Sequence, residues 1–209
     1  MALTNEDFEK VANDLGCEPA AVMAVQQVET GGAGGFNPDG TPKTLFEGHW
    51  FSKFTNHIYD ASHPTISYPK WTREFYGKTW QAEQARLEQA RQLDQDSAFK
   101  SASWGMFQVM GFNFASLGYP TITDFVAAMA ADELSQLEAF AGYVKHNNLA
   151  DELQRLDWAG FASRYNGPEY AQNHYDTKLA AAYAAHKGCL LYTSPSPRDY
   201  AASRMPSSA

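Results

Sequence analysis

The sequence has few cysteines and no long hydrophobic run. Its 209 residues include only two cysteines, Cys17 and Cys189. Cys189 falls in a C-terminal segment that we separate below, so we expect no internal disulfide, which is typical of a reducing compartment. No run of about 18 apolar residues could form a transmembrane helix. The start, MALTNEDFEK, lacks the basic and apolar regions of a signal peptide. We therefore expect no membrane association.

Positive charge is also scarce. The formal net charge is −8 at pH 7, which gives no support for nucleic-acid binding, because the phosphate backbone is bound by cationic side chains. Among six histidines, His49, His57 and His63 are irregularly spaced and form no HExxH pattern. We therefore expect no metal site and no other cofactor.

The last segment, residues 188–209, does not follow the pattern of the preceding chain. The stretch CLLYTSPSPRDYAASRMPSSA contains three prolines and five serines and has no helical period. It also looks like translated sequencing-adapter DNA at the end of a metagenomic fragment. We therefore expect one domain over residues 1–187, followed by a disordered tail of artificial origin.

Most of the domain has helical periodicity, and its length suits one sizeable core. Helices are expected over residues 19–29, 80–93, 133–146 and 168–186, among others. Residues 36–76 differ, because aromatic residues and prolines crowd there, and a short hairpin is possible around Thr44–Phe46. The sequence therefore predicts an α+β fold that is predominantly α-helical.

One stretch, AVMAVQQVETGGAGGF, places a single glutamate at the end of an apolar helix. Val22, Val25 and Glu29 share one helical face. Burial and the helix dipole would both favour a protonated Glu29 near neutral pH, as a general acid requires. The following glycines permit close approach by backbone or sugar. Spacing alone equally allows Glu29 to cap the helix and point into water.

Two further stretches, SASWGMFQVMG and RYNGPEY, combine small, aromatic and amide side chains. In the first, Gln108 is a candidate buried amide that would hold a sugar hydroxyl or a water. Trp104 and Phe107 taken alone are more simply explained as core residues. In the second, Asn166-Gly167 is equally well explained as a helix C-cap.

Together these motifs resemble the superfamily of goose-type lysozymes and lytic transglycosylases. The order is a glutamate before a glycine-rich loop, then S-x-G-x-x-Q, then Y-N-G-x-x-Y. More closely, the chain from Leu3 to about Lys187 resembles the N-acetylmuramidase domain of phage endolysins. The resemblance implies a lysozyme-like fold and hydrolysis of the β-1,4 bond between N-acetylmuramic acid and N-acetylglucosamine in bacterial peptidoglycan.

The resemblance also implies site residues. Glu29 matches the catalytic glutamate of the family, although this chain has Glu29-Thr30 where relatives often have Glu-Ser. Glu47, in LFEGHWF, is the candidate second carboxylate, but a structural or surface role is equally open. The substrate-binding candidates are Ser103, Trp104, Gln108, Tyr165, Asn166 and Tyr170.

Two other functions stay open for a lysozyme-like chain. A lytic transglycosylase would use the same acid and form anhydro-muramic products. A structural or peptidoglycan-binding domain would not use the acid at all. We favour an endolysin: a monomer that stays in the host cytoplasm until lysis and then reaches the periplasm or cell wall.

Overall fold

The computed structural model describes residues 2–165 and 167–193. The N-terminal part contains α1 (Asn5–Leu15), α2 (Pro19–Thr30), β1 (Thr44–Phe46), α3 (Gly48–Phe54), α4 (Trp80–Leu93) and α5 (Gln95–Lys100). The middle contains β2 (Ala102–Trp104), β3 (Val109–Met110), the 3₁₀ helix η1 (Gly111–Asn113), α6 (Ile122–Ala131) and α7 (Glu133–His146). The C-terminal part contains α8 (Ala150–Arg155), α9 (Trp158–Tyr165), the 3₁₀ helix η2 (Pro168–Ala171) and α10 (Tyr175–Thr193). The fold is α+β and mostly helical, as predicted.

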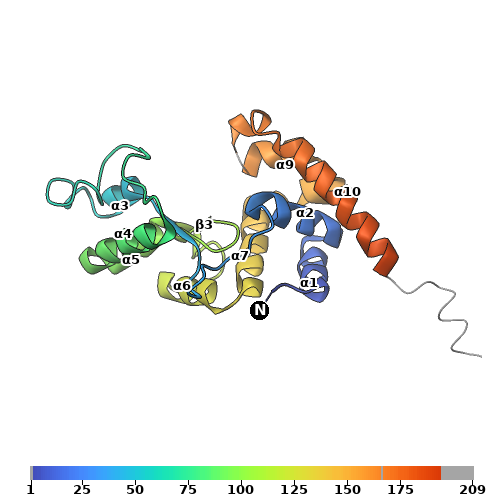
Figure 1. Ribbon diagram of the computed structural model, residues 1–209, viewed down its shortest axis with the longest axis horizontal. Coiled ribbons are helices and arrows are strands. Elements are labelled where there is room, and N and C mark those ends of the chain that lie inside the picture. The colour runs from blue at the N-terminus through green and yellow to red at the C-terminus, as the bar shows by residue number, and fades with distance from the viewer. Residues whose placement is uncertain (1, 166, 194–209) are drawn as a thin grey trace, which may run out of the picture.

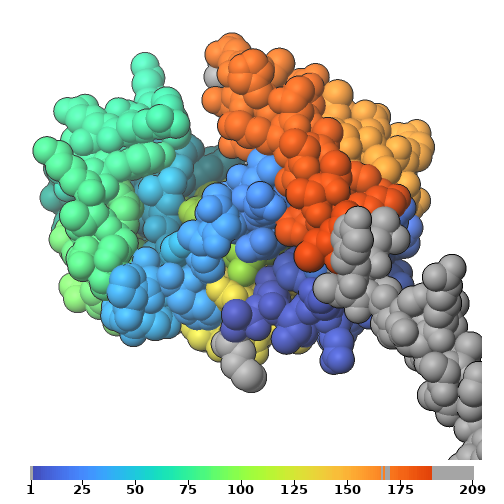
Figure 2. Space-filling model, turned by 45° about the vertical axis from the view of Figure 1, so that its right-hand side comes forward, coloured from blue at the N-terminus to red at the C-terminus, as the bar shows by residue number. Residues whose placement is uncertain are grey.

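The elements form two groups with the small sheet between them (Figure 1). Helices α3, α4 and α5 lie on one side, and α1, α2, α9 and α10 lie on the other. Helix α7 packs against α1 and α6 and carries core residues Leu137, Phe140 and Val144. In space-filling view the surface is hollowed between the two groups (Figure 2).

The first two helices follow local rules. Thr4 and Asp7 form a capping box at the start of α1, and Gly16 ends the helix in the left-handed region with φ 69°. Pro19 opens α2, where its missing N–H leaves no hydrogen bond unmade. Helix α2 then packs against both α1 and α10, which fixes the helix that carries Glu29.

The expected strand at Thr44–Phe46 is present, but the expected local hairpin is wrong. Strand β1 pairs antiparallel with β2, with Leu45 opposite Ser103, and β2 pairs antiparallel with β3. Directly after β1 the chain enters α3, so no partner strand follows locally. The preceding turn contributes only an isolated bridge between Phe36 and Pro42.

The last helix also differs from its prediction over residues 168–186. Pro168–Ala171 forms only a 3₁₀ turn, and His174 adopts a left-handed φ of 55°, which separates this turn from α10. Helix α10 then continues to Thr193, past the boundary expected at residue 187. Residues 194–209 lie outside the described part of the chain, and their artificial origin stays a prediction.

Candidate active site

Glu29 lies in the last turn of α2 and is half-buried. Its helical neighbours Val22 and Val25 are fully buried on the shared face. The hydroxyl of Thr30 donates to the Gln26 carbonyl at 2.7 Å and accepts the Gly32 N–H at 3.0 Å. Gly31 ends the helix with φ 61°. Thr30 and Gly31 therefore terminate the helix and present Glu29 at its end.

The glycine-rich loop after Glu29 packs against a buried amide. A Cβ atom on Gly35 would lie 1.7 Å from Oε1 of Gln136, a residue only 1% exposed. This oxygen accepts the Met106 N–H at 2.7 Å, and the Gln136 Nε2 donates to the Met129 carbonyl at 2.8 Å. Close approach was predicted for these glycines, and at Gly35 the approaching group is a protein side chain.

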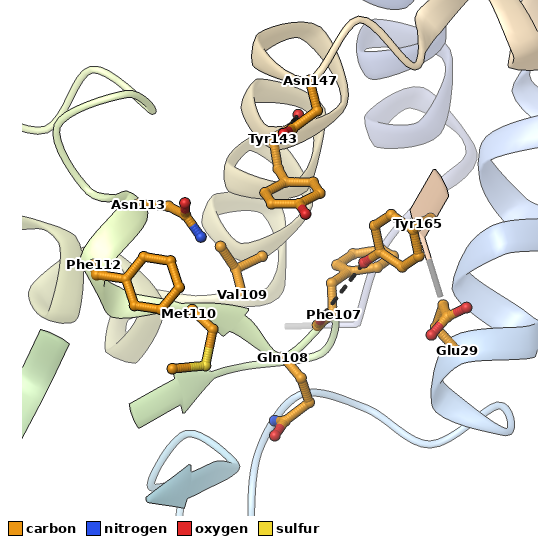
Figure 3. A pocket seen from close by; sticks show the side chains of 10 residues that line it. All are labelled: Glu29, Phe107, Gln108, Val109, Met110, Phe112, Asn113, Tyr143, Asn147 and Tyr165. Atoms are coloured by element: carbon orange, nitrogen blue, oxygen red, sulfur yellow. Dashed lines mark hydrogen bonds between the residues drawn. The ribbon is translucent and has the colours of Figure 1, made fainter. Parts of the chain in front are cut away.

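Two cavities meet at Glu29 and Gln108. The first measures about 340 Å³ and the second about 490 Å³. The first is shown in Figure 3 and is also lined by Phe107, Val109, Met110, Phe112, Asn113, Tyr143, Asn147 and Tyr165. The second is also lined by Thr30, Gly34, Phe36, Asn37, Pro38, Lys43, Thr44, Trp80, Gly105 and Met106. Space for a ligand therefore extends to both sides of Glu29.

Two tyrosines, Tyr165 and Tyr175, lie close enough to Glu29 to interact with its charge. Tyr165 donates a long hydrogen bond of 3.4 Å to the Phe107 carbonyl (Figure 3), and its ring stacks on Phe161. Burial, and then the charge of Glu29, raises the pKa of Tyr165 well above its usual value. The same two causes raise the pKa of Tyr175. Both hydroxyls therefore stay protonated beside the acid.

Gln108 belongs to the site, but it is exposed, so the prediction of a buried amide is wrong. It lies in the turn between β2 and β3 with φ 51°. Its Oε1 accepts the Ser103 hydroxyl at 2.8 Å, and its Nε2 donates to the carbonyls of Gly105 at 2.9 Å and Lys43 at 3.4 Å. Ser103 is buried and orients Gln108 through this hydrogen bond. Of the two residues, only Gln108 is among the described residues that line both cavities.

Trp104 and Tyr170, two other motif residues, are not among the described residues that line the cavities at Glu29. Trp104 is 4% exposed, and its indole N–H donates to the Phe99 carbonyl at 3.1 Å. It lines a third cavity and is not among the described residues around Glu29. Tyr170 packs against the main core, and Asn166 lies outside the described residues. The structure therefore does not bring Trp104 to the acid.

Glu47 immediately precedes α3 and lies in a network of its own. The Tyr76 hydroxyl lies 2.7 Å from both carboxylate oxygens of Glu47 and donates its one proton to the carboxylate. Nδ1 of His49 lies 3.3 Å from Oε2. Burial, and then the hydrogen bond to Glu47, raises the pKa of Tyr76. Burial lowers the pKa of His49, against the opposite effect of Glu47. Glu47 is not among the described residues that line the two cavities at Glu29.

Sequence reasoning missed several residues around the acid. Tyr143 and Asn147 come from the end of α7, and Tyr175 begins α10. None belongs to a motif, and only the tertiary fold places them near Glu29.

Within residues 2–165 and 167–193, no cluster of three or more histidine, cysteine or acidic side chains could hold a metal ion. No helix there is long and apolar enough to span a bilayer.

Comparison with known proteins shows the family of the chain. No curated protein sequence matches the chain. The crystal structure of the Burkholderia AP3 phage endolysin superposes with a TM-score of 0.83 at 38% identity, over 88% of this chain and 71% of that one. The family model for N-acetylmuramidase matches residues 18–187. The chain therefore belongs to the N-acetylmuramidase family, which confirms the resemblance seen in its motifs.

Proposed function

We propose that this N-acetylmuramidase acts as a phage endolysin, with Glu29 as its general acid. The observation that supports this role is the position of Glu29 at the junction of the two cavities. A polysaccharide lying across both cavities would present a glycosidic oxygen to the acid and leave sugars bound on either side. The similar crystal structure, which is that of a phage endolysin, supports the same biological role.

The surroundings of Glu29 suit proton donation. The carboxyl group is half-buried at the C-terminal end of α2, where the helix dipole disfavours negative charge. Burial keeps Tyr165 and Tyr175 protonated, so neither of them competes as a phenolate for the proton of Glu29. Glu29 would protonate the glycosidic oxygen while an oxocarbenium-like state develops on the departing sugar.

Hydrolysis also needs a positioned water. Gln108 lines both cavities and is fixed by three hydrogen bonds, which suits a rigid polar contact. Glu47 remains the candidate second carboxylate, and the Tyr76 hydroxyl orients it. In this proposal Glu47 activates the attacking water or stabilises positive charge on the sugar.

The variant Glu29→Gln tests the acid, because it keeps the shape and removes the transferable proton. The rate of hydrolysis of purified peptidoglycan should fall by about 10²–10⁴-fold or more. Glu9→Gln, on the exposed surface of α1, is the matched control and should keep wild-type activity. A folded Glu29→Gln protein that clears peptidoglycan at the normal rate would remove Glu29 from the mechanism.

The products distinguish hydrolysis from transglycosylation. Attack by water leaves a reducing-end muramic acid, whereas attack by the C6 hydroxyl of that sugar gives an anhydro product lighter by one water. Mass spectrometry of the muropeptides, before and after borohydride reduction, separates the two. We expect reducible ends. Dominant anhydro ends would contradict hydrolysis and leave Glu29 as the acid.

The cellular role follows from the same proposal. The chain would remain in the host cytoplasm until lysis and then act on the periplasmic cell wall as a monomer. Peptidoglycan would be its partner, without nucleic acid or membrane. Light scattering on the purified chain measures its molecular mass in solution. A mass twice that of the chain would show a dimer and contradict the proposed monomer.

A further inference from the structure

The two cavities at Glu29 differ in charge. Lys43 is the one cation among the described residues that line the second cavity, and the described lining of the first contains none. Apart from Glu29 itself, the other polar side chains that line this cavity, which include Thr30, Asn37 and Thr44, are neutral, and Trp80 adds an aromatic surface. In a chain with net charge −8, a cation on one side of the acid favours an anionic substrate group on that side.

The backbone of Lys43 is held firmly. Its N–H donates to the Gly35 carbonyl at 2.9 Å. Its carbonyl accepts the Gly105 N–H at 2.8 Å and the Gln108 side-chain amide at 3.4 Å. Strand β1 begins at the next residue. The backbone of Lys43 is therefore held by the same loops that shape the Glu29 site.

The ammonium group of Lys43 is available to a ligand. None of the ion pairs found between residues of the described ranges includes Lys43. Its side chain is half-buried, so a bound carboxylate would be less screened by solvent than at an open surface.

Peptidoglycan supplies such an anion on one of its two alternating sugars. N-acetylmuramic acid carries a lactyl ether, whose carboxyl is either free or linked to a peptide with carboxylates of its own. N-acetylglucosamine has no charged group. The geometry points to the second cavity as the site for the muramyl residue and its substituent, with Lys43 paired to a carboxylate of that substituent. This inference rests on the proposed function and adds to it the recognition of a carboxylate on the muramyl substituent.

Binding to the inactive Glu29→Gln protein tests the inference without requiring turnover. The probes are tetrasaccharide muropeptides with free carboxylates and the same compounds with every carboxyl converted to a methylamide. Lys43→Met should weaken binding of the free acids by about fivefold, an effect of the size measured for partly exposed ion pairs. It should leave binding of the methylamides unchanged, and the difference should shrink at high salt.

Two further variants make the result specific. Lys70→Met makes the same change in net charge at an exposed position that lines neither cavity, and it should bind both probes normally. Lys43→Arg keeps the charge and should retain the preference for free acids. Equal affinity of Lys43→Met and its parent for the free acids, or equal weakening by Lys70→Met, would overturn the inference.

The test is also distinct from that of the proposed function. Peptidoglycan left intact by the wild-type chain would contradict the hydrolase while leaving charge-dependent binding in place. Active hydrolysis together with charge-independent binding would contradict only the role of Lys43.

Discussion

Removing Arg86 should destabilise the protein strongly, because it leaves a buried carboxylate without its cation. Nη1 of Arg86 lies 3.0 Å and 3.1 Å from the two carboxylate oxygens of Glu83, one helical turn earlier in α4. Glu83 is 6% exposed and Arg86 is 9% exposed. In Arg86→Met the charge of Glu83 stays in the interior with only backbone donors.

The pair also joins two chain segments next to the Glu47 network. Glu83 accepts the N–H groups of Phe46, at 3.3 Å, and of Gly77. Arg86 donates to the Phe46 carbonyl at 3.3 Å. Phe46 precedes Glu47, and Gly77 follows Tyr76, so the buried pair positions both partners of that hydrogen bond.

The expected loss for Arg86→Met is about 3–5 kcal/mol of unfolding free energy, the cost of breaking a buried pair from one side. For a chain of this size each kcal/mol lowers Tm by about 2–4 °C, so the midpoint should fall by roughly 6–20 °C. Circular dichroism during urea and thermal unfolding measures both. The double variant Glu83→Gln with Arg86→Met should regain part of the loss, because it removes the stranded charge.

The same helix provides the control. Arg91 and Glu88 also form an i,i+3 pair, with Nε to Oε2 at 2.7 Å, but their side chains are 43% and 46% exposed. Arg91→Met should cost less than about 1 kcal/mol. A loss of stability in Arg86→Met no larger than in Arg91→Met, or a double variant less stable than the single one, would contradict the role of the buried pair.

Substitutions at Gly35 and in the Glu47 network, and alkylation of the two cysteines, test other parts of the structure. Gly35→Ala should lower Tm and activity, because its Cβ would lie 1.7 Å from a buried amide oxygen; an unchanged melting curve would contradict this packing. If Glu47 acts as the second carboxylate, Glu47→Gln should reduce kcat, and Tyr76→Phe, which keeps the carboxylate but removes the hydroxyl that orients it, should reduce kcat by less; full activity of both variants would give Glu47 a structural role. Burial raises the pKa of the Cys17 thiol to about 11, so iodoacetamide at pH 8 should modify exposed Cys189 well before Cys17; peptide mass spectrometry after timed labelling would show equal rates if this were wrong.

The features that the sequence predicted correctly are those that depend on residues close together in the chain. The capping box at Thr4 and the proline at the start of α2 are local signals, and the structure contains both. Glu29 was identified because its helix, the glycine loop and two motifs occur in a fixed order, and the family comparison confirms that resemblance. Its position at the junction of two cavities was not available from the sequence.

What the sequence could not predict depends on contacts between distant segments. Strand β1 was expected, but its partner β2 is separated from it by three helices. Gln136 is the one polar residue among the buried residues of α7 and has no motif around it, yet it fixes the loop at Met106. Tyr175 follows the Y-N-G-x-x-Y motif and approaches Glu29 only through the packing of α10 on α2.

The stretch from Ser103 to Gln108 shows why a recognised motif need not consist of residues that contact substrate. Ser103 holds the Gln108 amide, and Trp104 is held in the core by the Phe99 carbonyl. Gly105 has φ 71°, and a Cβ there would lie 2.6 Å from the Gln136 side chain. These three residues build a turn that brings Gln108 to the cavities at Glu29. Residues of a motif can therefore be mostly buried and still serve the site through the one exposed amide that they bring to the cavities.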